Sequence, residues 1–459
     1  MSEKEKQPNA QVSSSRTAGE AGWHLSRYNL TAPVPGKDKL VIANLFKGTC
    51  AVYSSIELYL LNELDGLDEH HPILERFAKR GIITKIDERA ALETMGRIAC
   101  AYGQTVSLTI CPTMACNFDC PYCFENHRPG KMSPNTQEEV LELTKRMLDA
   151  SKAESLNVTW FGGEPLLGVD VIQHLSEKLM ALTAERNVKY NAGIITNGYL
   201  LTQDVADLLG RCAVSKAQIT LDGLGPAHDS TRHLVDGGQT FERITKNLRT
   251  LKLPFHVNVR HNVHENNRDD IEPLKAFVKA LANESGNSIL YSSAPVSGND
   301  VSDKRSTNTR LLCGSDSSEL AIRQNAFKFK SGRGHYCGAN MLFSVCVDNQ
   351  GRLYKCFEDI DKPERSFGVA ARWNPNDPIA SADAPDCLTS YLNTALPLND
   401  PECLECIWLP TCIGGCPHRK LYYEKRSCLP YRNEPEKYVT ALYERLQEQI
   451  KRKNVCASS

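Results

Sequence analysis

The sequence predicts an α/β protein whose centre is a partial (β/α)6 barrel of the TIM type. Between residues 104 and 310, six strand-like runs alternate with five helical patterns. Such alternation produces right-handed crossovers and a parallel sheet, which closes fully or partly into a barrel. Strands and amphipathic helices precede this region at 25–103, and a cysteine-rich segment follows it at 311–434. Three parts fit a length of 459 residues.

The first part predicts a small winged-helix-like module. Residues 1–24 are polar and lack an apolar core segment, so we expect a disordered leader rather than a secretory signal. The module's strands and amphipathic helices are expected, in chain order, at RYNLTAP, KLVIANLF, SSIELYLLNEL, HPILERFAKRG, IITKI and RAALETMGRIACAY. At the other end of the chain, residues 435–459 are expected to form a helix and tail.

The barrel region reads as a regular series. The strands are expected at TVSLTI, LNVTWF, YNAGIIT, KAQITL, FHVNVR and SILYSS. The helices are expected at TQEEVLELTKRMLDA, DVIQHLSEKLMALTAE, TQDVADLLGR, TFERITKNLRTL and RDDIEPLKAFVKALA. In such barrels the chemistry lies at the carboxyl ends of the strands.

Charge and hydropathy exclude some classes of function. Lys and Arg number 54 against 55 Asp and Glu, a formal net charge of −1, so there is no basic field for nucleic acid. No apolar run approaches the roughly 20 residues that span a bilayer. We expect a soluble, cytoplasmic protein with neither nucleic acid nor membrane as a partner.

The 18 cysteines are unevenly placed. In a cytosolic chain, clustered thiols indicate metal binding or catalysis rather than disulfides. They concentrate at 111–123 and at 337–428. Five stand alone and are expected to be small buried hydrophobes or incidental thiols, namely Cys50, Cys100, Cys212, Cys387 and Cys456.

The first cluster has the pattern CxxxCxxC, formed by Cys116, Cys120 and Cys123, and it directly follows the first barrel strand. A structural zinc site needs four ligands, commonly in CxxC pairs, and Cys111 is a possible fourth. Three thiolates alone can hold three irons of a [4Fe–4S] cube and leave the fourth iron open. The spacing favours the open iron–sulfur cluster over zinc.

At these residues the chain resembles the radical SAM superfamily, over roughly residues 104–430. The resemblance implies that the open iron binds S-adenosylmethionine (SAM), which an electron from the cluster cleaves to a 5′-deoxyadenosyl radical. Phe118 matches the family's usual aromatic residue between the first two cysteines, although simple loop packing is equally compatible.

The resemblance also implies the SAM contacts. Gly162 and Gly163 in WFGGEP end the second strand and permit close backbone approach. They are expected to lie along the methionine part of SAM, with Glu164 facing its ammonium group. Thr220 would approach the ribose or carboxylate and Arg232 the carboxylate. An ordinary strand-end turn is the alternative for the glycine pair.

The second cluster looks like the seven-cysteine SPASM extension, which carries two auxiliary [4Fe–4S] clusters and so brings the total to three. The implied inner set is Cys337, Cys356 and Cys416. The implied outer set is Cys403, Cys406, Cys412 and Cys428. A structural zinc ribbon is the alternative, and Cys346 is expected to belong to the core. Either Cys313 completes the inner cluster or an iron there stays open for a substrate thiolate.

Three functions compete. The first is a thioether-forming maturase of the sactipeptide or ranthipeptide type, which links a cysteine sulfur to a carbon in a cysteine-rich precursor peptide. The second resembles anaerobic sulfatase maturases, which convert Cys or Ser to formylglycine. The third is a zinc-stabilised peptide-binding protein without radical chemistry.

Two features favour the thioether maturase. The 115 residues before Cys116 look like a leader-recognition module, which takes the leader peptide as an added strand. In addition, Phe357 stands where sulfatase maturases place an Asp base directly after the cysteine that matches Cys356. The resemblance implies a flavodoxin or ferredoxin-type reductant, and no catalytic base is assigned.

Overall fold

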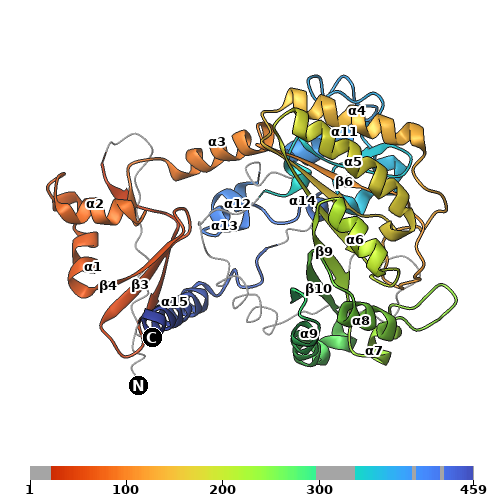
Figure 1. The fold of residues 1–459 in the computed structure, drawn as a ribbon. Helices are drawn as coiled ribbons and strands as arrows, with labels where there is room; N and C mark the ends of the chain where they lie inside the picture. Colours follow the sequence, from red (N-terminus) through yellow and green to blue (C-terminus); the bar gives the residue numbers. More distant parts are fainter. Residues whose placement is uncertain (1–21, 296–335, 395–399, 424–427, 458–459) are drawn as a thin grey trace, which may run out of the picture.

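The computed structural model describes residues 22–295, 336–394, 400–423 and 428–457. Figure 1 shows the N-terminal module and the barrel standing apart, with the helices α12 and α13 of the C-terminal part between them. The predicted α/β class and partial barrel are confirmed. Cys313 lies outside the described residues.

The barrel sheet is built from six strands that pair in sequence order, and each neighbouring pair is parallel. Every strand overlaps a run expected from the sequence. Their bounds are β6 (Thr105–Ile110), β7 (Ser155–Trp160), β8 (Lys189–Thr196), β9 (Val214–Thr220), β10 (His256–Val263) and β11 (Ile289–Pro295).

The longer barrel helices form because each carries an apolar stripe that is buried in the fold. In the first of them, Ser133 caps the N-terminus by accepting from Thr136 N, Pro134 occupies the first turn, and Val140, Leu143 and Met147 are buried at helical spacing. The helices are α4 (Pro134–Ala150), α5 (Val169–Glu185), α6 (Gln203–Arg211), α7 (Pro226–Asp229), α8 (Phe241–Thr250) and α9 (Ile271–Ser285). The short 3-10 helices η2 (Pro165–Gly168) and η3 (Glu265–Asp270) precede α5 and α9.

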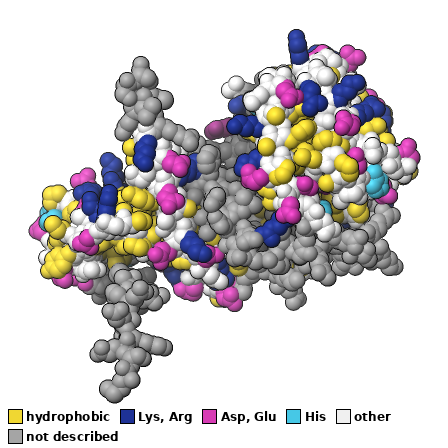
Figure 2. All heavy atoms as spheres, turned by 90° about the horizontal axis from the view of Figure 1, so that it is seen from below, with side chains coloured by type: hydrophobic (Ala, Val, Ile, Leu, Met, Phe, Trp, Pro, Cys, Tyr) yellow, Lys and Arg dark blue, Asp and Glu magenta, His cyan; other side chains and the backbone are white. Residues whose placement is uncertain are grey.

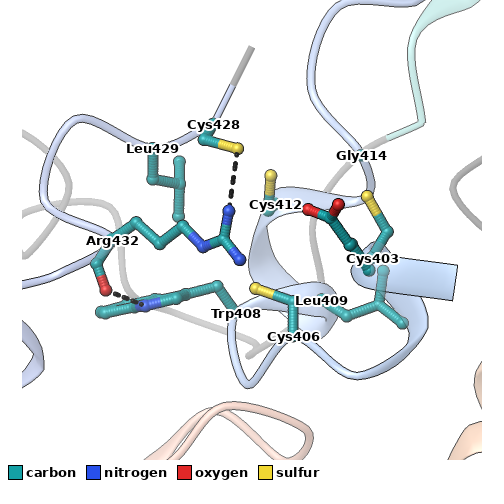
Figure 3. A pocket seen from close by; sticks show the side chains of 10 residues that line it. Cys403, Cys406, Trp408, Leu409, Cys412, Gly414, Cys428, Leu429 and Arg432 are labelled. Carbon is teal, nitrogen blue, oxygen red and sulfur yellow. Dashed lines mark hydrogen bonds between the residues drawn. The ribbon is translucent and has the colours of Figure 1, made fainter. Parts of the chain in front are cut away.

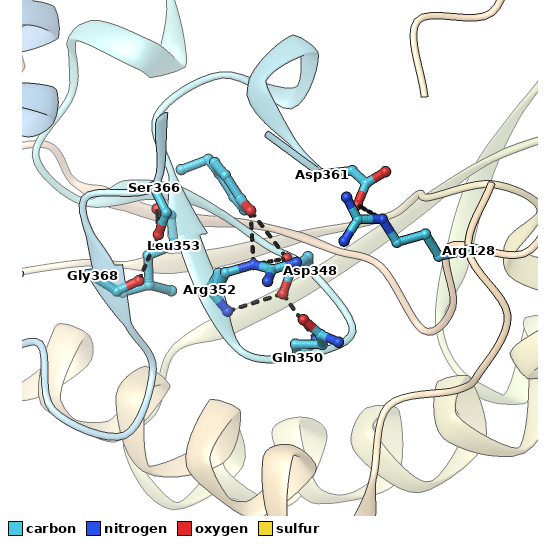
Figure 4. Close-up of polar contacts among 9 residues, drawn as sticks. Arg128, Asp348, Gln350, Arg352, Leu353, Asp361, Ser366 and Gly368 are labelled. Atoms are coloured by element: carbon cyan, nitrogen blue, oxygen red, sulfur yellow. Dashed lines mark hydrogen bonds and ion pairs between the residues drawn. The ribbon is translucent and has the colours of Figure 1, made fainter. Parts of the chain in front are cut away.

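The C-terminal part continues the barrel sheet. Strand β12 (Ser344–Val347) pairs in parallel with β6, and β13 (Arg352–Tyr354) and β14 (Gly368–Val369) follow antiparallel, which gives nine strands. Asp348 closes the β12–β13 hairpin, because its Oδ2 accepts from Arg352 Nε at 2.8 Å and from Tyr354 OH at 3.1 Å (Figure 4). The cysteine-rich segment is therefore fastened directly to the first barrel strand.

Several short elements and one long helix make up the rest of the C-terminal part. They are η4 (Gly338–Asn340), η5 (Phe357–Asp359), η6 (Pro363–Arg365), α11 (Pro385–Thr389), η7 (Ser390–Thr394), α12 (Pro401–Leu404), α13 (Leu409–Cys412), α14 (Pro417–Tyr423) and the long α15 (Pro435–Ala457). Across the part of the chain that the structure describes, we find no helix with the length and apolar character of a membrane span.

The N-terminal module has a three-stranded antiparallel sheet in the order β2–β3–β4. Sequence reasoning missed β4, which runs straight into a helix whose start is fixed by a capping box between Ser54 and Glu57. The elements are β1 (His24–Leu25), β2 (Asn29–Pro33), β3 (Lys39–Asn44), β4 (Thr49–Ser54), α1 (Ser55–Asn62), η1 (Leu64–Gly66), α2 (Pro72–Lys79), β5 (Ile83–Thr84) and α3 (Glu88–Ala101).

The module and the C-terminal part share one hydrophobic core. Tyr28 and Leu45 of the module are buried in one cluster with Trp408, Tyr438 and Leu442, and α15 lies along the module's sheet (Figure 1). An ion pair of 2.9 Å also joins Arg27 to Glu405, and Arg89 contacts the same carboxylate. Removing residues 25–103 would therefore expose this core.

Replacing Leu442 by Ala tests this shared core. Its side chain is 2% exposed, so the substitution leaves a cavity and should lower the free energy of unfolding by about 2–4 kcal/mol. Ile450→Ala on the same helix is the control, because its side chain is 52% exposed and its loss should cost no more than about 0.5 kcal/mol. Guanidinium unfolding followed by circular dichroism measures both, and equal effects would contradict the shared core.

Candidate active site

The three cysteines of the first cluster line one cavity at the carboxyl end of the barrel strands. They lie in the loop between β6 and α4. Phe118 N donates to Cys116 Sγ at 3.4 Å, and Cys123 N donates to Cys120 O at 3.0 Å, which tightens the loop. The loop thus presents all three thiols to the same space.

The cavity holds about 490 Å³, a volume typical of sites for small ligands. Besides the thiols, its wall contains Gly162 and Gly163 after β7, Thr196 and Asn197 at the end of β8, and Thr220 of β9. Four of the five SAM contacts implied by the resemblance meet there, namely Gly162, Gly163, Thr220 and Arg232.

The glycine pair is required by the cysteine loop itself. A Cβ on Gly162 would lie 2.3 Å from Thr113 O, and one on Gly163 would lie 2.4 Å from Ala115 O. Gly162 also has φ +110°, a conformation that side-chain-bearing residues rarely adopt. The backbone of the cysteine loop therefore rests directly on the end of β7.

Glu164 lies behind the cavity wall and is absent from its lining. Its buried carboxylate accepts from Thr196 Oγ1 at 2.6 Å, Asn197 N at 2.8 Å and Leu166 N at 3.0 Å. Its backbone N donates to Ala115 O at 2.8 Å. Glu164 thus joins the ends of β7 and β8 to the cysteine loop, and its contact with SAM stays a prediction.

Arg232 is held against the cysteine loop. Its Nη1 donates to Tyr122 OH at 2.7 Å, and that hydroxyl donates to the buried Asp222. The guanidinium also lies over the Phe118 ring, 5.7 Å from its centroid. Its Nε is buried and has no hydrogen-bond partner among the described residues.

A sequence profile of the Radical SAM superfamily matches residues 110–278. The chain carries a radical SAM domain. The resemblance inferred from the cysteine loop is therefore confirmed, and the matched range begins at the end of β6 and contains the whole loop and the glycine pair.

Curated relatives are similar over parts of the chain. The radical SAM cyclopropyl synthase TigE of Paramaledivibacter caminithermalis is 24% identical over 151 residues, which is 30% of each chain. A GTP 3′,8-cyclase of Clostridium botulinum is 24% identical over 238 residues, 49% of this chain and 70% of the cyclase. The sporulation killing factor maturation protein SkfB of Bacillus subtilis is 25% identical over 170 residues, 37% of this chain and 38% of SkfB.

Solved structures share the fold. Native anSMEcpe with bound AdoMet has a TM-score of 0.56 at 19% identity, and the alignment covers 74% of this chain and 98% of that chain. The same protein with AdoMet and the Cp18Cys peptide has a TM-score of 0.55 over equal coverage. This likeness shows that about three quarters of the chain has the fold of that protein.

A radical SAM domain implies SAM and one [4Fe–4S] cluster, and the residues present fit both. Three sulfur donors face one cavity, and soft thiolates are the ligands that iron–sulfur clusters require. Burial raises the pKa of Cys116 to about 12, so the thiol stays protonated without iron, and cluster binding displaces the proton.

Sequence reasoning missed several residues of this cavity. Cys123 Sγ lies 3.3 Å from His127 Nε2, and Glu125 is close to both. Burial, together with the Asp361 and Glu164 carboxylates, raises the pKa of Glu125 to about 8. These residues follow the third cysteine in the run CFENH, and that adjacency was the available signal.

The outer set of cysteines converges on one pocket. Cys403, Cys406, Cys412 and Cys428 line it together, although they come from α12, the turn after it, α13 and a later loop (Figure 3). Arg432 points between the sulfurs, and its Nη1 donates to Cys428 Sγ at 3.5 Å. Four converging thiols beside a cation fit an anionic metal–thiolate centre.

A buried polar link joins the segments that carry Cys356 and Cys416 of the inner set. Cys356 precedes η5, whose Asp359 lies 3.1 Å from Nε2 of His418, two residues after Cys416. Burial raises the pKa of Cys416, and Cys337 is among the neighbouring groups that raise it further. Cys346 is buried on β12, as its predicted core role requires.

The segment after Cys356 forms part of the radical SAM cavity. Phe357 and Glu358 line it, and Phe357 packs on Phe161 and Phe124 with ring centroids 5.7 and 6.2 Å away. An ion pair of 2.9 Å between Arg128 and Asp361 fastens the cysteine loop to the same segment (Figure 4). The C-terminal part therefore completes the cavity wall.

Replacing Gly163 by Ala tests the contact beneath the cysteine loop. The added Cβ meets the Ala115 and Met114 carbonyl oxygens, which are backbone atoms, so the loop must move. After anaerobic reconstitution, iron should fall by about four atoms per chain. Gly66→Ala, which has no atom within 4 Å of the new Cβ, is the control and should keep its iron. Full iron and SAM binding in Gly163→Ala would contradict the account.

Proposed function

We propose that this protein is a radical SAM peptide maturase that joins a cysteine sulfur to a carbon of a ribosomally made precursor peptide. One observation carries the proposal. The thiols of the cysteine loop and the Phe357–Glu358 segment, which follows Cys356 of the inner set, line the same cavity. A substrate in this cavity lies between the radical SAM loop and the inner auxiliary site.

In this proposal, the chain's own residues hold the cluster and orient SAM. When bound, SAM and its cluster supply a 5′-deoxyadenosyl radical. Cys116, Cys120 and Cys123 would hold the iron, and Gly162 and Gly163 would leave room for the methionine part of SAM. Arg232, which lines the cavity, would present its guanidinium to the SAM carboxylate.

The reaction removes two hydrogens and forms one carbon–sulfur bond. A hydrogen atom leaves the acceptor carbon and ends in 5′-deoxyadenosine. The cysteine thiol gives up its proton to solvent, and bond formation releases one electron. A one-electron carrier of the flavodoxin or ferredoxin type supplies the starting electron and takes the released one. The outer and inner thiol sets would hold auxiliary [4Fe–4S] clusters, which would supply a route for the electron between the cavity and this carrier.

Peptide binding is assigned to the N-terminal module. Strand β4 is an edge of its sheet, so its free backbone groups can pair with an added strand of leader peptide. On the adjoining helix α1, Ile56 and Tyr59 are 75% and 63% exposed and lie on one face. Figure 2 shows apolar side chains gathered on this module. SkfB, by its name a maturation protein, and the peptide-bound anSMEcpe support a peptide substrate.

Formylglycine formation is the second candidate, because the carboxylate of Glu358 lines the cavity one residue beyond the position of the sulfatase-maturase base. Mass spectrometry of a cysteine-rich precursor peptide after incubation with the enzyme distinguishes thioether formation from formylglycine formation. A cross-linked product loses two hydrogens and resists thiol alkylation, whereas formylglycine carries an aldehyde that reacts with hydrazides.

Replacing Cys116, Cys120 and Cys123 together by Ala removes every protein ligand of the SAM cluster. Formation of 5′-deoxyadenosine under reducing conditions should vanish, and iron should fall from about twelve to about eight atoms per chain. Chromatography and metal analysis measure these quantities. Two or three zinc ions in the wild-type protein, with little iron, would contradict radical chemistry and favour the zinc-stabilised binding protein.

Replacing Cys403 and Cys406 by Ala removes two ligands of the outer set. We expect SAM cleavage to persist in part while peptide cross-linking is lost, because the radical SAM cavity keeps its own ligands. Loss of solubility in this variant would also agree with a metal site at the outer set, since metal binding stabilises small thiol-rich folds. Cross-linking at the wild-type rate would show that the outer site is dispensable.

A further inference from the structure

The cavity contains a second arginine that the predicted SAM contacts do not use. Arg260 lies on β10 and lines the cavity together with Asn262 of the same strand and Gln218 of β9. Residues 260 and 262 share one face of the strand because side chains alternate. Arg260 pairs with Thr220 in the sheet register, so it stands one strand beyond the expected SAM contacts.

The guanidinium of Arg260 has donors to spare. Its Nε donates to Asn262 Oδ1 at 3.2 Å, and no carboxylate of a described residue forms an ion pair with it. Asp222, the nearest candidate, is already occupied. Its Oδ1 accepts from Asn262 N at 3.3 Å, and its Oδ2 accepts from Tyr122 OH and from Thr231 Oγ1.

Asp222 is the charged neighbour of Arg260, but its oxygens accept from other groups, so the half-buried guanidinium lacks a carboxylate bound to its own donors. A carboxylate ligand would supply one. Arginine presents two terminal donors in a planar fork that matches a carboxylate. Asn262 uses its oxygen for Arg260 and keeps its amide donors, and Gln218 adds further donors from the next strand. Together these three side chains form a wall suited to a carboxylate.

We propose that Arg260, Asn262 and Gln218 form a subsite for a carboxylate of the peptide substrate, an Asp or Glu side chain close to the reacting residue. The inference rests on the proposed function, and it names the substrate class more closely. SAM also has a carboxylate, but its expected partner is Arg232, which lines the same cavity and donates to Tyr122 of the cysteine loop. Arg260 lies farther along the sheet.

Binding measurements test the subsite without turnover. The probes are two fluorescein-labelled, C-terminally amidated octapeptides of Gly and Ser with one Cys, which differ only in carrying Asp or Asn beside the Cys. Fluorescence anisotropy gives their Kd values with anaerobically reconstituted, SAM-saturated protein and no reductant. We expect the wild type to bind the Asp peptide about tenfold more tightly, and Arg260→Gln to bind both equally.

Two further variants sharpen the result. Arg249→Gln removes the same charge from an exposed pair with Glu284 outside the cavity, and it should keep the tenfold preference. Arg260→Lys keeps the charge but not the planar fork, so its preference should be intermediate. This variant carries the test if Arg260→Gln fails to fold, which circular dichroism will show.

SAM binding is the second readout, measured by equilibrium dialysis on the same proteins. If the peptide carboxylate is the ligand, Arg260→Gln changes the peptide preference and leaves the Kd for SAM within about threefold. A rise in the SAM Kd with an unchanged peptide preference would assign Arg260 to SAM and overturn the proposal. Equal binding of both peptides by the wild type, or binding of neither, also overturns it. If the wild type forms no 5′-deoxyadenosine yet prefers the Asp peptide, the proposed function fails and the subsite stands.

Discussion

Backbone contact between the cysteine loop and the end of β7 is the constraint on which the site depends. The loop carbonyls of Thr113 and Ala115 occupy the space where side chains on Gly162 and Gly163 would lie. Glu164 then fastens the loop to β8 through its backbone N and its buried carboxylate. Three thiols can face one cavity because these contacts leave the loop little freedom to move.

The C-terminal part extends this arrangement rather than standing beside it. Strand β12 joins the edge of β6, so the segment that follows Cys356 is delivered to the same cavity. The outer thiol set lies at the other side of this part, next to the core shared by Trp408 and the module. We propose peptide recognition for the N-terminal module, electron transfer for the C-terminal thiol sets and radical chemistry for the barrel cavity. Packed elements connect these three sites.

Much of this could be predicted from the sequence. The barrel strands and helices follow from period-two and helical patterns, and the thiol groups from their spacing. The exceptions have physical reasons. Strand β4 passes directly into α1 without a turn signal, and α9 begins later than expected because residues before it form a 3-10 helix. Glu164 lies behind the cavity wall because its carboxylate accepts from Thr196, Asn197 and Leu166, contacts that only the folded chain brings together.

The inward polar residues of β10 were also missed. Asn258, Arg260 and Asn262 alternate with buried residues, which indicates a polar lumen only once the strand is known to face a cavity. Family resemblance assigned roles to residues that match its motifs, and Arg260 matches none of the motifs used. The structure shows that Arg260 lines the cavity and that its Nε donates to Asn262, which the sequence does not reveal.

The central claim is that Cys116, Cys120 and Cys123 hold a cluster whose open iron binds SAM within the described cavity. Electron–nuclear double resonance on the reduced protein with SAM labelled by ¹⁵N at the amino group tests it most directly. The account predicts coupling between the labelled nitrogen and one reduced cluster, lost when these cysteines are replaced. SAM binding without any such coupling in the wild-type protein would contradict it.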